Sequence, residues 1–316
     1  MNAYRAALAA LSIPLAAALI IASKPAPSAA ASSGLAWDSI TKMTQNADTS
    51  TLSPGSFDAD FAAASAAKTV NMGPAWMMGK SQKSAAQNAM LMMKEGLAEH
   101  HYVAGSKERT DEIVAATATI TDCAARTITT LDLGAKTYHV TSMDSPETGS
   151  SSGGGGSGSG RDSDTKVAIT IVNTALGAKE VGGQPTNGYR SDMTITETSS
   201  SGSSTHNADV LGYYSNYASP SAACSRYAGR EGASGRGMDM TGGYMRIMQA
   251  LSSAGDPRFS FKQTGPALPL GKLSMFTAMS FSAGGRSGAL ITERGNVRTI
   301  SDTDPIFSVP SDFTQR

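Results

Sequence analysis

A mainly β (α+β) fold with a few packing helices is predicted for this chain by three observations. From residue 98 onward, β-branched and polar residues alternate with a period of two, which is typical of strands with one buried face. Short turns containing Gly, Ser and Ala separate these segments. Two segments, 84–96 and 242–255, instead carry an apolar stripe at helical spacing. A chain of 316 residues is long enough for one large β-rich domain or two smaller ones.

The first elements follow from the N-terminal third of the chain. Residues 34–44, GLAWDSITKMT, predict a strand, and a short helix is expected near 58–68 with Ser56 as a cap. In the helix predicted for 84–96, Ser84 can serve as N-cap and Gly96 ends the helix.

An antiparallel meander is predicted for the next segment, residues 98–144. Its strands read AEHHYV, SKERTDEI, ATATITD, RTITTLD and KTYHVTSMD, with Gly-Ser, Cys-Ala-Ala and Leu-Gly-Ala turns between them. We expect one face of this sheet to meet a core and the other to meet water.

The tract 149–160 consists of glycine and serine alone. Such a coil has a root-mean-square reach of roughly 17–21 Å. Strands of similar composition continue on both sides, which favours a disordered loop inside a single domain spanning residues 34–316. A linker between two independent domains is the alternative.

Strands resume after this tract and continue to the end of the chain. TKVAITIVNT, GYRSDMTITET and ADVLGYYSNY predict three of them, with a loose hairpin loop at 199–207. Three tail segments, KLSMFTAMSFSA, GALITERGNVRTI and DPIFSVPSDF, predict two or three more.

Export is predicted by the N-terminus. Residues 1–5 carry one positive charge, residues 6–22 form an apolar run, and Ala29-Ala30-Ala31 supplies a small-residue cleavage pattern. We expect residues 1–31 to be a signal peptide and the mature chain to have no transmembrane segment; an uncleaved anchor is the alternative. The balance of 26 basic and 26 acidic residues gives no electrostatic basis for binding nucleic acid.

The two cysteines of the chain, Cys123 and Cys224, favour one disulfide in an oxidising compartment. The bridge would close a loop of about 100 residues, worth roughly 4–5 kcal/mol in the chain-entropy model. Two buried free thiols and one reactive cysteine are the alternatives.

Catalysis is not predicted, because no nucleophile, base and orienting group can be assembled from the sequence; no cofactor is implied either. His100 and His101 are adjacent on a predicted strand, so they point to opposite faces and cannot bind one metal ion. We expect them to be surface residues of an exposed hairpin.

The sixteen methionines suit Cu(I). Those at 90–93 fall on a helical stripe, however, where Met is ordinary core filler, and no metal site is predicted.

Several segments resemble a known family: HYVAGSKERTD (101–111), RTITTLDLGAKTYHV (126–140), GAKEVGGQPTNGYRSDMTI (177–195) and DPIFSVPSDF (304–313). They resemble exported bacterial proteins with a lipoprotein-carrier-like (Lol-type) half-barrel fold, similar to the Lol carriers of the Gram-negative periplasm. The resemblance implies an antiparallel curled sheet, an open half-barrel, with two or three helices packed on its concave face. The Gly/Ser tract, the two cysteines and the Met/Ala-rich segment before the meander depart from the true carriers.

What the resemblance implies for function is a periplasmic, non-catalytic binding or carrier module for an apolar ligand, a lipid or a lipidated protein. The candidate cavity residues lie on the two helical stripes: Met90, Met93, Leu97, Tyr244, Ile247, Met248 and Leu251. Ordinary core packing needs the same stripes and is the alternative for these residues.

Two other functions stay open. One is a structural or protein-interaction component of the cell envelope with a solid core, and the other is a hydrolase with a site built from distant loops around His139 or His206.

Overall fold

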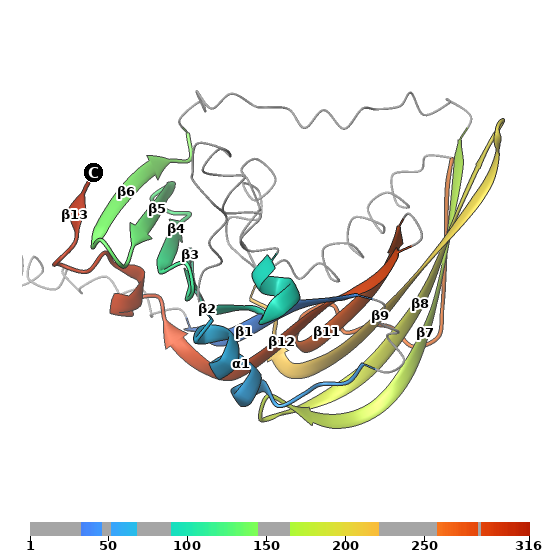
Figure 1. Cartoon of the computed structure of the whole chain (residues 1–316), viewed down its shortest axis with the longest axis horizontal. Coiled ribbons are helices and arrows are strands. Elements are labelled where there is room, and N and C mark those ends of the chain that lie inside the picture. Colours follow the sequence, from blue (N-terminus) through green and yellow to red (C-terminus); the bar gives the residue numbers. More distant parts are fainter. Residues whose placement is uncertain (1–32, 46–51, 68–89, 145–164, 221–257, 284–285) are drawn as a thin grey trace, which may run out of the picture. The chain divides into compact units, whose positions relative to one another are not determined.

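A computed structural model of the chain describes residues 33–45, 52–67, 90–144, 165–220, 258–283 and 286–316 (Figure 1). The described strands form one sheet in the order β10-β7-β8-β9-β11-β12-β1-β2-β3-β4-β5-β6-β13. The sheet is open, because β10 and β13 stand at its two ends. The prediction of a mainly β fold is confirmed.

The elements have the following bounds: β1 (Ser33–Gln45), α1 (Phe57–Ser65), β2 (Leu97–Ala104), β3 (Lys107–Glu112), β4 (Thr117–Asp122), β5 (Thr127–Asp132), β6 (Thr137–Ser142), β7 (Lys166–Val181), β8 (Gln184–Ser199), β9 (Gly202–Ala218), β10 (Phe259–Thr264), β11 (Lys272–Ala283), β12 (Arg286–Ser301), the 3-10 helix η3 (Pro305–Phe307) and β13 (Thr314–Gln315). Neighbouring strands are antiparallel except at the two ends of the sheet, where β10 runs parallel to β7 and β13 parallel to β6.

Strand β1 joins the two halves of the sheet. It pairs with β12 on one side and with β2 on the other, so the strands before and after the Gly/Ser tract belong to one sheet (Figure 1). The tract itself, 149–160, lies outside the described residues, as does the predicted signal peptide at 1–31. The disordered loop, the domain bounds and export therefore stay predictions.

The meander predicted from the alternating pattern is confirmed and has a regular ten-residue repeat. Strands β3 to β6 begin at residues 107, 117, 127 and 137. The last residue of three successive turns has a positive φ: Ala116 at 49°, Arg126 at 56° and Lys136 at 52°. Asp122 and Asp132 each end a strand, and their Oδ1 atoms accept N–H donors of the following turn at 2.8–3.0 Å. Short aspartate side chains thus hold the backbone in these turns.

The prediction of a loose loop at 199–207 is wrong. Strands β8 and β9 continue to Ser199 and from Gly202, so only a tight turn separates them. Hydroxyl and amide side chains pair across this hairpin, which keeps the polar strand ends in register. The pairs are Thr194–Asn207 at 3.2 Å, Thr196–Thr205 at 3.5 Å and Thr198–Ser203 at 3.4 Å.

The strands predicted for the three tail segments are confirmed in two cases and wrong in the third. The first two form β11 and β12, whereas DPIFSVPSDF is not a strand. Asp304 caps the 3-10 helix η3 by accepting the N–H of Ile306 at 2.9 Å, and Phe307 is buried against the meander. Pro305 and Pro310 lack the N–H groups that a strand ladder needs, which explains the difference.

Helix α1 confirms the short helix expected near 58–68, although Ser56 makes no side-chain capping bond. Residues 90–94 are helical and Gly96 follows with a φ of 101°, so the predicted stop at Gly96 is confirmed. The rest of that helix and the predicted helix at 242–255 lie outside the described residues.

The two faces of the sheet can be followed from alternation along β1. Ile40 lies on the face that α1 covers with Phe57 and Ala64, and we call this the α1 face. Trp37 and Ser39 lie on the opposite face, which we call the Trp37 face. Because directly opposite residues of paired strands share a face, the registers assign every strand's residues to one or the other.

Cys123 lies in the turn between β4 and β5 and is not a free thiol. Its predicted partner, Cys224, lies outside the described residues, so the pairing itself stays a prediction.

Candidate functional site

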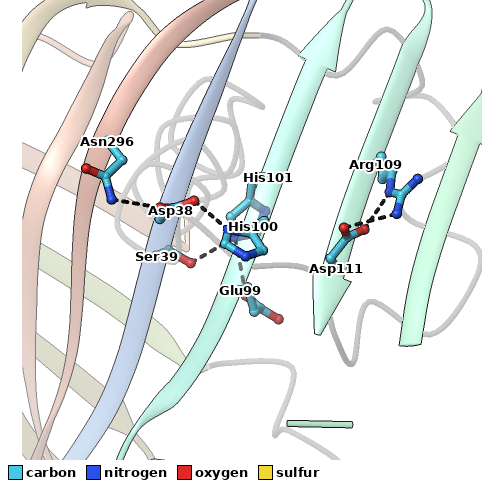
Figure 2. Close-up of polar contacts among 8 residues, drawn as sticks. All are labelled: Asp38, Ser39, Glu99, His100, His101, Arg109, Asp111 and Asn296. Carbon is cyan, nitrogen blue, oxygen red and sulfur yellow. Dashed lines mark hydrogen bonds and ion pairs between the residues drawn. The ribbon is translucent and has the colours of Figure 1, made fainter. Parts of the chain in front are cut away.

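The centre of the sheet carries two polar clusters, a partly buried one on the α1 face and a buried one on the Trp37 face of the β1–β2 pair (Figure 2). Adjacent residues of β2, His100 and His101, form the middle of one cluster each. The opposite orientation predicted for the two histidines is therefore confirmed.

On the α1 face, Asp38 is the centre of a hydrogen-bonded group. Its Oδ1 accepts from His100 Nδ1 at 2.6 Å and its Oδ2 accepts from Asn296 Nδ2 at 2.8 Å. Phe61 of α1 packs beside the imidazole of His100, with ring centroids 5.5 Å apart. Burial raises the pKa of Asp38, but the hydrogen bonds from His100 and Asn296 outweigh it, and the net shift is downward.

The same face carries a buried ion pair on β3. Arg109 donates from Nε to Oδ1 of Asp111 at 2.6 Å and from an Nη atom to Oδ2 at 3.1 Å (Figure 2). A further Nη atom donates to the carbonyl of Ile306 at 2.8 Å. The bidentate geometry, together with that third bond, gives each guanidinium nitrogen a partner and ties η3 to the sheet.

On the Trp37 face, His101 is surrounded by groups from three strands. Ser39 Oγ lies 2.8 Å from Nε2 and Glu99 Oε2 lies 3.3 Å from the same nitrogen. Thr110 Oγ1 lies 3.4 Å from Nδ1, and the indole of Trp37 stacks on the imidazole at 5.2 Å between centroids. Only 6% of His101 is exposed, so the group is isolated from bulk water.

Ser39, His101 and Glu99 do not form a catalytic triad. In a triad the acid orients the imidazole through the nitrogen opposite to the one that faces the nucleophile. Here Ser39 and Glu99 both approach Nε2, and Nδ1 faces a threonine. Ser39 is also buried in the middle of a strand, at 2% exposure. The arrangement can bind and orient polar groups, and it lacks the geometry for nucleophilic attack.

Two buried polar atoms of this cluster have no hydrogen-bond partner: Glu99 Oε1 and Trp37 Nε1. Glu112 stands directly opposite Glu99 on β3. The pKa of Glu112 is raised, mainly by burial and to a smaller extent by the charge of Glu99. The cluster thus contains an unused acceptor, an unused donor and two neighbouring carboxyl groups.

Further along the sheet, the Trp37 face becomes apolar. The buried side chains Val167, Ile169, Ile171 and Met193 form one hydrophobic cluster on β7 and β8. The cross-strand registers continue this face with the row Val210, Met279, Leu290 and Met43 from β9 to β1. One face of one sheet therefore carries a polar cluster at β1–β3 and an apolar surface at β7–β10.

The cavity residues predicted from the sequence are only partly described. Met90 and Met93 are 39% and 47% exposed, while Leu97 is buried as the first residue of β2. Leu91, which was not among the candidates, is buried at 3%. Tyr244, Ile247, Met248 and Leu251 lie outside the described residues, so the cavity assignment stays a prediction.

The expectation that His100 and His101 are surface residues of an exposed hairpin is wrong for His101, whereas the side chain of His100 is 35% exposed. Strand β2 lies inside the sheet between β1 and β3, and His101 and its neighbour Glu99 are buried. Sequence analysis missed the two clusters, although the run Glu99-His100-His101 in an otherwise apolar strand is a signal that could have found them.

No protein-family model, curated protein or solved structure matches this chain. In the described part of the chain, no helix is long and apolar enough to cross a membrane. The same residues contain no group of three or more His, Cys, Asp or Glu side chains placed to hold a metal ion.

Proposed function

We propose that this protein is an exported, non-catalytic carrier for an apolar ligand, such as a lipid or the acyl chain of a lipidated protein. The observation that carries the proposal is the apolar part of the Trp37 face, which spans β10, β7, β8 and β9 of an open sheet. The long strands β7, β8 and β9 supply the length that an extended chain would need.

The apolar surface has to be covered, because each large apolar side chain favours burial by about 1.5–3 kcal/mol. Leu268 and Leu270, from the segment after β10, pack on it from outside the sheet. Gly265 lets this segment turn close over β7, with a φ of 85° and no room for a Cβ beside the Asn173 carbonyl. Asn173 then donates from Nδ2 to the carbonyl of Pro266 at 2.9 Å.

A binding titration with a fluorescent acyl-chain probe tests the proposal. Ala208 packs at the edge of the apolar cluster, so Ala208→Phe would fill space beside Met193 on the Trp37 face. Ala168→Phe is the matched control, because Ala168 is exposed on the other face of β7. We expect the wild type and Ala168→Phe to bind the probe saturably with one equivalent, and Ala208→Phe to bind at least tenfold more weakly while remaining folded.

A solid core predicts a different result. Overpacking would then destabilise Ala208→Phe by about 1–3 kcal/mol. If the wild type binds no probe and this loss of stability is observed, the carrier proposal is wrong and the scaffold alternative takes its place.

A further inference from the structure

We infer that the polar cluster of the Trp37 face binds the head group of an amphipathic ligand, and that this head group carries a protonated amine with an oxygen acceptor close to it. The inference rests on the proposed carrier function and names the class of its ligand. It is carried by the position of two unpaired buried atoms and of the carboxyl groups around them.

The unpaired atoms are Glu99 Oε1, in a residue that is 1% exposed, and Trp37 Nε1, in a residue that is 9% exposed. Native proteins pair nearly all buried polar atoms, so two unpaired atoms in one cluster require an explanation. Trp37 stands opposite His101, two residues from Glu99 on the same face, which makes Trp37 and Glu99 diagonal neighbours about 7 Å apart. A single small head group can reach both.

Glu99 already has one basic neighbour, since its Oε2 lies 3.3 Å from His101 Nε2, and its other oxygen, Oε1, is the one left for a cation. Glu99 and Glu112 face each other across β2 and β3, and a positive charge between them would remove their mutual repulsion. Arg294 lies across from Ser39 on the same face, but its Nη1 atom donates to the carbonyl and hydroxyl oxygens of Ser274 on β11, at 2.8 and 2.6 Å. This Nη1 atom is therefore engaged by β11.

An organic ammonium group fits better than a metal ion. Trp37 Nε1 can only donate, so it needs an acceptor oxygen, which a bare cation does not provide. An amino-alcohol or ethanolamine-type head group offers N–H donors to Glu99 and an oxygen to Trp37. Its ammonium would form a charge-assisted hydrogen bond, which is about twice as strong as a neutral one.

The apolar part of such a ligand has a path along the same face. Ser39, Thr41 and Met43 alternate on β1, and Met43 stands opposite Leu290. Four residues of strand separate Ser39 from Met43, a distance of about 13 Å. The chain of an amphiphile can therefore run from the polar cluster to the apolar row that leads to β9.

A matched pair of ligands tests the head group: N-dodecylethanolamine and the dodecyl ether of ethylene glycol, which differ only in an ammonium nitrogen or an ether oxygen. Isothermal titration at pH 7 should show the wild type binding the amine at least tenfold more tightly than the ether. Glu99→Gln should reduce this preference to about onefold and leave the affinity for the ether unchanged. Glu180→Gln, which changes the same charge at an exposed position of β7, should keep the preference.

The outcomes separate the two proposals. Equal binding of the amine and the ether by the wild type, or an unchanged preference in Glu99→Gln, overturns the head-group inference and leaves the carrier function in place. Absence of binding by both ligands overturns both. The wild-type comparison needs no variant, so it stays decisive even if Glu99→Gln does not fold.

Discussion

Removing the Asp38 carboxylate should destabilise the protein by an amount that the structure allows to be worked out. Asp38 is 7% exposed and accepts two hydrogen bonds, from His100 at 2.6 Å and from Asn296 at 2.8 Å. A hydrogen bond to a charged group contributes about 1.5–3 kcal/mol. The imidazole of His100 is 35% exposed and Asn296 is an exposed residue, so both bonds belong at the lower end of the range. We therefore expect Asp38→Ala to lower the free energy of unfolding by about 3 kcal/mol.

Asp38→Asn should cost about half as much, because the amide keeps the shape and one neutral hydrogen bond while Asn296 can turn its amide to match. The pKa of Asp38 is lowered by folding, so its carboxylate stabilises the fold above the unfolded value of 3.8. This contribution is lost as the pH falls through the lower, folded value. The difference between wild type and Asp38→Asn should therefore be constant near neutral pH and shrink only in strong acid.

The assay is urea unfolding at pH 7, in which a shift of the midpoint at constant slope reports stability. Asp192→Ala is the control, since Asp192 forms a pair with Arg190 at 2.9 Å but its side chain is 49% exposed. Exposed pairs contribute about 0–1 kcal/mol, so this variant should stay close to wild type. A cost below about 1 kcal/mol for Asp38→Ala would refute the reasoning that the partly buried cluster stabilises the sheet.

Three further predictions concern two glutamates, one turn of the meander and the predicted disulfide. Burial raises the pKa of Glu112 and Glu293, so the folded state binds more protons than the unfolded state and stability falls as the pH rises through the folded values. Glu112→Gln and Glu293→Gln should each raise the urea midpoint at about pH 8 and lose this gain at about pH 4; no gain at the higher pH would contradict the burial argument. Ala116→Gly should be stabilising by roughly 0.5–1 kcal/mol in the same assay, because Ala116 has a φ of 49°, and a loss of stability would show that the turn is not strained. If Cys123 and Cys224 are bridged, reduction should raise the intact mass by two hydrogen atoms and lower stability by roughly 4–5 kcal/mol; equal masses before and after reduction would exclude the bridge.

The local sequence pattern was sufficient to predict the meander, but it was not sufficient to predict the two polar clusters. A period of two and turn residues at regular intervals are local signals, and they predicted β2 to β6 well. The contacts of Asp38 join residues 62 and 258 positions apart in the sequence, and no local pattern carries such a register. The same limit applies to β10, whose parallel pairing with β7 brings Phe261 opposite Ile169.

For His100 and His101, the predicted orientation is right, and the predicted exposure is wrong for His101. Alternation along a strand fixed the opposite orientation of His100 and His101. Exposure depends on which strands flank β2, and β1 arrives from a segment more than fifty residues earlier. The strand predicted for 304–313 is wrong for a different reason. Two prolines and the Asp304 cap favour a turn over a strand in this segment.

The proposed carrier function is tested most directly by native mass spectrometry of the wild-type protein, purified without detergent. The account predicts a reproducible adduct of lipid mass that is lost on denaturation, with a basic nitrogen in the released molecule. A clean mass that does not shift when N-dodecylethanolamine or dodecanoate is added would contradict it and favour a scaffold with a solid core.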